Sequence, residues 1–175
     1  MKQIISERTR KNMNRWVAPV RFTVSLLFTA VLIMLCDIYG MSDLPYRSTF
    51  NLGADIVSMG VCTVLLYSLM QDKEGVSDYT RTFVLLISAT STVLFSDACC
   101  WLVDEEPALR ELNIIVNVFN FLSAAFLIFY LLMYVFNALQ LGGRVMNIAK
   151  TLMAVLLVPN SVGCLVNLFA SLFQC

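Results

Sequence analysis

Residues 82–135 read TFVLLISATSTVLFSDACCWLV (82–103), DEEPALRE (104–111) and LNIIVNVFNFLSAAFLIFYLLMYV (112–135). The first and last pieces are predominantly apolar, and each matches the roughly 20 residues that a helix needs to cross a bilayer core. The acidic piece between them contains Pro107, and proline suits the first turn of a helix. The pattern predicts two antiparallel membrane-spanning helices joined by a tight turn.

Three further apolar segments of similar length flank this pair, at about 17–39, 48–70 and 151–173. Hydrophobic residues make up 59% of the chain, charged residues only 14%, and the mean hydropathy is +0.78. These values lie far from those of an average soluble domain. We therefore expect an all-α polytopic integral membrane protein with a basic N-terminal arm at 1–16 and a transmembrane domain of five helices at 17–175.

Basic residues are concentrated in alternate connections, which predicts the orientation. Lys2, Arg8, Arg10, Lys11, Arg15 and Arg21 lie before or at the start of the first span, Lys73 and Arg81 follow the second, and Arg144 and Lys150 follow the fourth. The connection after the first span carries Asp43 and only Arg47, and the one after the third carries Asp104, Glu105, Glu106 and Glu111 with Arg110. Because Lys and Arg favour the cytoplasmic side, we expect the N-terminus inside and the C-terminus outside. The arm adjoins a span, so its expected partner is the lipid surface and not nucleic acid.

The chain contains no histidine and no paired-acid or GxSxG motif. The commonest metal ligand and the commonest general base are therefore missing. We expect no metal, no cofactor and no enzymatic activity in this chain. Its six cysteines lie in or beside apolar segments, where thiols usually pack as small hydrophobes, and a single bridge among Cys36, Cys100 and Cys175 is left open.

Polar side chains gather at one depth of the predicted bundle, in the outer third. Asp55 on the second helix and Asp97 on the third lie at this level, and Asn51 and Asn167 are at a similar depth. The fourth helix adds an asparagine stripe with i, i+4, i+7 spacing, formed by Asn113, Asn117 and Asn120, and Trp101 is expected to cap it on the outer side. The candidate ligand-binding residues are Asp55, Asp97, Trp101, Asn113, Asn117 and Asn120.

Two interpretations of these polar residues stay open at this point. Asn and Asp side chains hold transmembrane helices together by hydrogen bonds, which would make the cluster structural. Alternatively, they line a water-accessible pocket that opens outward, since a carboxylate in a membrane should face the bundle interior or water. In either case we expect the asparagine stripe to face the second and third helices, with Asn117 nearest the level of Asp97.

Two short motifs in this region resemble a known family. The first has the form D-x-x-x-W-L-x-D and the second the form L-N-x-x-x-N-x-x-x-F; their fixed residues are Asp97, Trp101, Leu102 and Asp104, then Leu112, Asn113, Asn117 and Phe121. The stretch resembles the multi-span N-terminal sensory region of bacterial signalling proteins common in gut Firmicutes. In that family a cytoplasmic diguanylate cyclase or histidine kinase domain follows the membrane region.

The resemblance implies a sensory or signal-transduction module in the bacterial cytoplasmic membrane. This chain has an additional helix at 17–39 and stops after the fifth span, so we expect a truncated sensor or a stand-alone protein that lacks the output domain. The expected signal is a repacking of helices two to five, relayed by the long fourth helix to a second copy or a cytoplasmic signalling partner. The alternative is a small transporter or transporter subunit in which Asp55 and Asp97 bind a cation or proton, although no inverted repeat is visible.

Overall fold

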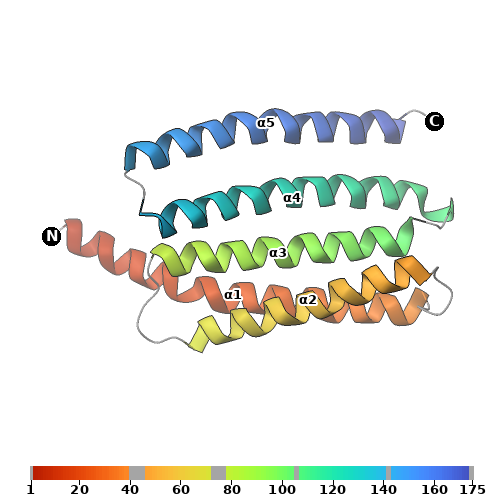
Figure 1. Ribbon diagram of the computed structural model, residues 1–175, viewed down its shortest axis with the longest axis horizontal. Coiled ribbons are helices and arrows are strands. Elements are labelled where there is room, and N and C mark those ends of the chain that lie inside the picture. The colour runs from red at the N-terminus through yellow and green to blue at the C-terminus, as the bar shows by residue number, and fades with distance from the viewer. Residues whose placement is uncertain (1, 40–45, 72–77, 105–106, 141–142, 174–175) are drawn as a thin grey trace.

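The computed structural model describes residues 2–39, 46–71, 78–104, 107–140 and 143–173. Their helices are α1 (Lys2–Tyr39), α2 (Tyr46–Gln71), α3 (Asp78–Val103), α4 (Arg110–Ala138) and α5 (Gly143–Phe173), with a short 3-10 helix, η2 (Pro107–Leu109), before α4. Consecutive helices run in opposite directions along one long axis (Figure 1). The all-helical prediction is confirmed for this part of the chain, and Pro107 does begin a helical turn.

The helices are stacked in the order α1 and α2, then α3, then α4, then α5 (Figure 1). α3 is central because it packs against α1, α2 and α4, whereas α5 packs mainly on α4. We call the end of the bundle where α3 finishes and α4 starts the Trp101 end, and the opposite end the Tyr79 end. The first turn of α1 lies at the Tyr79 end and the last turn of α5 at the Trp101 end (Figure 1).

Four helices of the described chain are long and apolar enough to cross a membrane. The stretches are Ala18–Ile38, Ser48–Gln71, Tyr79–Val103 and Arg110–Ala138. In α5 the corresponding apolar stretch, Lys150–Val166, is shorter. The chain is therefore a membrane protein in which four of the five predicted spans are confirmed as candidates by length and composition. The fifth span and the orientation stay predictions.

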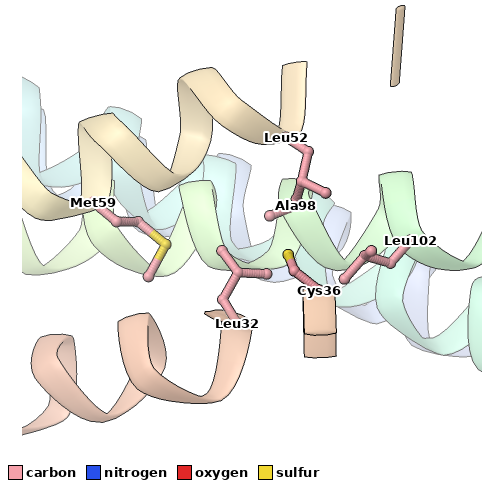
Figure 2. Close-up of a cluster of buried hydrophobic side chains, with 6 residues drawn as sticks. All are labelled: Leu32, Cys36, Leu52, Met59, Ala98 and Leu102. Carbon is pink, nitrogen blue, oxygen red and sulfur yellow. The ribbon is translucent and has the colours of Figure 1, made fainter. Parts of the chain in front are cut away.

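Among the described residues, the buried apolar clusters consist of residues of α1, α2 and α3. One buried cluster brings Leu32 and Cys36 of α1 together with residues of α2 and α3 (Figure 2). A second cluster, towards the Tyr79 end, consists of Ala18, Cys62, Leu66, Val84 and Ile87. By contrast, α4 has one buried side chain among its described residues, Ser123. The buried clusters thus belong to α1, α2 and α3, and α4 packs extensively along α3.

Hydroxyl groups tie the three core helices together near the middle of the bundle. Ser25 Oγ of α1 lies 2.8 Å from Thr63 Oγ1 of α2 and 2.9 Å from Ser91 Oγ of α3. Ser25 and Ser91 are each only 2% exposed, so water does not compete for these hydrogen bonds. This hydroxyl cluster lies at least one helical turn from the predicted site, towards the Tyr79 end. Its role is structural, because small polar residues that let helices approach closely are typical of membrane interfaces.

Candidate functional site

The Asp97 carboxylate is the centre of a hydrogen-bonded group between α3 and α4. Its Oδ2 accepts a hydrogen bond from Trp101 Nε1 at 3.3 Å, one turn further along α3. Its Oδ1 accepts from Asn120 Nδ2 of α4 at 3.2 Å. The oxygen of the same amide group, Asn120 Oδ1, accepts a hydrogen bond from Ser96 Oγ at 2.8 Å. Both carboxylate oxygens are therefore satisfied by neutral donors, which lowers the cost of placing the acid in a membrane helix.

The rest of the asparagine stripe continues this group towards the Trp101 end. Asn117 Nδ2 donates to the Asn113 backbone carbonyl at 2.9 Å and also to the Asn113 side chain. Asn117 Oδ1 accepts a weak bond from Cys100 Sγ at 3.7 Å, and Asn113 Nδ2 donates to Asp104 Oδ1 at 3.1 Å. We call this set the α3/α4 ladder; its members are Ser96, Asp97, Cys100, Asp104, Asn113, Asn117 and Asn120.

The ladder differs from the sequence-based expectation in two respects: among the described residues the stripe bonds across to the α3 side and not to α2, and Asp97 bonds to Asn120 and not to Asn117. The reason for the second difference is the antiparallel register set by the turn between the helices. Asp104 pairs with Asn113 next to that turn, so each turn back along α3 corresponds to one turn forward along α4. Two turns from the first pair therefore bring Asp97 opposite Asn120. The sequence-based reasoning also missed Ser96, although its neighbour Asp97 already marked the level.

A second set of polar contacts joins α3 and α4 at the Tyr79 end. Asn137 Nδ2 of α4 donates to Thr82 Oγ1 of α3 at 2.7 Å. The hydroxyls of Tyr79 and Tyr134 are hydrogen-bonded, and Phe83 packs on Tyr134 with ring centroids 5.3 Å apart. None of these residues was predicted. The available signal was spacing, because Tyr134 and Asn137 fall on the continuation of the asparagine stripe at helical intervals.

Asp55 lies apart from the ladder, on the face of α2 that enters the three-helix core. It has the same orientation as Leu52 and Met59, which are fully buried. Its side chain is 8% exposed, and its Oδ2 is buried with no hydrogen-bond partner among the described residues. Asp97 is near enough for the two carboxylate charges to interact. The six predicted residues thus divide into five that bond within or beside the ladder and one, Asp55, that does not.

The chemistry available at this end is that of oxygen acceptors and amide donors. In the described part of the chain, no three His, Cys, Asp or Glu side chains gather as a metal-binding group. Cys36, Cys62, Cys99, Cys100 and Cys164 are free thiols. Cys175, one member of the bridge left open by the sequence, lies outside the described residues, as does the side chain of Asn167.

No protein-family model, curated protein or solved structure matches this chain. The resemblance to bacterial sensory regions therefore stays a prediction carried by the two motifs alone. Four of the fixed residues in those motifs, Asp97, Asp104, Asn113 and Asn117, are members of the ladder, and a fifth, Trp101, donates to Asp97. The spacing of the motifs thus places these side chains within hydrogen-bond distance of one another in this chain.

Proposed function

We propose that this chain is a membrane-embedded sensory or signal-transduction module in which movement of α4 against the α1–α3 core carries the signal. The observation that supports this proposal is the nature of the α3/α4 interface. Hydrogen bonds join the two helices at both ends, whereas α4 buries only Ser123 among its described side chains. An interface of this kind can exchange partners without opening an apolar core.

The energies involved suit a switch. An interhelical hydrogen bond in a membrane protein contributes about 0.6 kcal/mol on average and at most about 1.7 kcal/mol. Rearranging the few bonds of the ladder therefore costs on the order of 1–3 kcal/mol, which is the usual range of coupling between two sites. A ligand or a change in the bilayer that acts at the Trp101 end could shift α4 by supplying that much differential free energy.

The proposed arrangement in the bacterial cytoplasmic membrane has five spans with the N-terminus inside. The Trp101 end then faces outward and the Tyr79 end faces the cytoplasm. α4 is long enough to connect the two sides as one rigid element, at about 1.5 Å per residue. Displacement of its Tyr79 end would be read by a second copy or a cytoplasmic signalling partner.

The test is a distance measurement at the Tyr79 end after a change at the other end. Spin labels at Ser68→Cys in α2 and Ala138→Cys in α4, two exposed positions, report how α4 sits against the core. On a background with the native cysteines replaced by alanine, Asn120→Leu should shift or broaden the measured distance distribution by about 1–2 Å, the size of ordinary helix shifts in switching proteins.

The matched control for this measurement is Ser123→Ala. Ser123 is buried on the same helix but donates only to the Phe119 carbonyl of its own helix, at 2.8 Å. Its removal should leave the distance distribution unchanged. If Asn120→Leu also leaves it unchanged, α4 does not relay a change between the two ends and the proposed mechanism is wrong.

A further inference from the structure

Asp55 is the most conspicuous polar group that the ladder does not use. Its carboxyl group makes no hydrogen bond with any described residue, and Oδ2 is enclosed by the three-helix core. Asp97, at a similar depth, accepts two hydrogen bonds. A carboxylate has two oxygens with about four acceptor positions, and none of those of Asp55 is taken by a described residue, in a place where an uncompensated charge is costly.

Two other oxygen-bearing side chains continue from Asp55 towards the Trp101 end of α2. Ser48 and Asn51 precede it by seven and four residues, which places all three along one side of the helix. Ser48 is 4% exposed, and neither side chain makes a hydrogen bond with a described residue. Met59, one turn from Asp55 towards the Tyr79 end, is fully buried in the apolar cluster that contains Leu32 and Cys36 (Figure 2). The polar stripe therefore starts near the end of the helix and stops at Asp55.

We propose that Asp55 and Asn51 hold one small monovalent cation of the alkali-metal class, reached from the Trp101 end past Ser48. Asn51 is one turn from Asp55, so its amide oxygen and the carboxylate can converge on a single ion. Both ligands are hard oxygens, the type that binds cations of this kind. The inference does not depend on the sensory role of α4.

Charge balance favours a monovalent ion over a divalent one. The free ligand charge at the site is that of a single carboxylate, because the oxygens of Asp97 are occupied by Trp101 and Asn120. Asp97 still attracts a cation through space, since its charge interacts with that of Asp55. A proton is the alternative occupant of the Asp55 carboxylate, and the binding experiment described next distinguishes a proton from an alkali-metal cation.

The direct experiment is equilibrium binding of radioactive sodium to the purified full-length protein in detergent at pH 8, with choline chloride keeping the ionic strength constant. Wild type should bind sodium saturably, at one ion per chain, and potassium or lithium should compete. Asp55→Asn should abolish this binding. Asp97→Asn should retain saturable binding with weaker affinity, because it removes a nearby charge and no ligand. Ser123→Ala should match wild type.

Asn51→Leu tests the site without touching the carboxylate. It removes one proposed oxygen ligand, so sodium affinity should fall by about tenfold, in line with losses caused by weakening a cation site. Folding of each variant is checked by size-exclusion chromatography and circular dichroism. The proposal is overturned if wild type binds none of sodium, potassium and lithium saturably, or if Asp55→Asn or Asn51→Leu binds sodium as wild type does. If wild type shows no saturable binding of these cations but does show a pH-dependent change that Asp55→Asn abolishes, the group binds a proton and the proposal is overturned.

Discussion

Replacing Asp55 with leucine should stabilise the protein, whereas the same replacement of Asp97 should destabilise it. At Asp55 the change removes a buried polar group that has no partner among the described residues, and such groups cost about 1–3 kcal/mol. The free energy of unfolding of Asp55→Leu should therefore rise by an amount in that range. At Asp97 the change removes two hydrogen bonds and leaves the donors of Trp101 and Asn120 unpaired, so the free energy should fall by about 1–2 kcal/mol.

The two aspartates are a matched pair for this measurement. Both lie in the third of their span nearest the Trp101 end, and both are replaced by the same apolar side chain, so the gain from removing a polar group from the membrane is similar. Reversible unfolding in a bilayer-like solvent, with choline as the only monovalent cation, gives the two values. Changes of the same sign would show that Asp55 and Asp97 have equivalent surroundings, contrary to the contacts described above.

The second large effect concerns orientation and follows from the distribution of charge. Reporter fusions after Gln71 and Gly143 should be cytoplasmic, and fusions after Gly40 and Glu106 should be on the other side of the membrane. Lys and Arg in short connections decide which side stays inside, and these fusion points separate the connections that are rich in Lys and Arg from those that contain only one such residue each. If the Gly143 and Glu106 fusions report the same side, the five-span arrangement is wrong.

Neutralising the N-terminal arm tests the cause of that orientation. Replacement of Arg8, Arg10, Lys11 and Arg15 by uncharged residues removes most of the basic charge that precedes the first span. A mixed population should result, with part of the Gly40 fusion reporter on the cytoplasmic side. Replacement of Asp43 by asparagine is the control and should have little effect, since acidic residues contribute little to topology.

The helices could be predicted from the sequence because hydropathy, length and connection chemistry all agree. The common level of Asp97 and the asparagine stripe along the bundle was predictable for the same reason, since each helical residue advances by about 1.5 Å. Asn113, Asn117 and Asn120 do meet α3, as their common face predicts.

The hydrogen-bond partner of each polar side chain, and the neighbouring helix that it faces, could not be predicted. Asp55 and Asp97 show why. Depth alone did not distinguish Asn117 from Asn120 as the partner of Asp97, because the register depends on the turn through η2. Depth also grouped Asp55 with Asp97, although one faces the core with Leu52 and the other faces α4. In a membrane helix both the lipid face and the packed face are apolar, so hydropathy does not indicate which way a side chain points.

The claim on which the account depends most is that α4 is held to the core through the Asp97–Asn120 hydrogen bond. A double-mutant cycle of Asp97→Leu and Asn120→Leu, measured by reversible unfolding, isolates that contact. We predict a coupling energy of about 0.6–1.7 kcal/mol for this pair, the range of interhelical hydrogen bonds in membrane proteins. The parallel cycle of Asp97→Leu with Asn117→Leu should be additive within about 0.3–0.5 kcal/mol. Additive effects at Asp97 and Asn120, or a larger coupling at Asp97 and Asn117, would contradict the account.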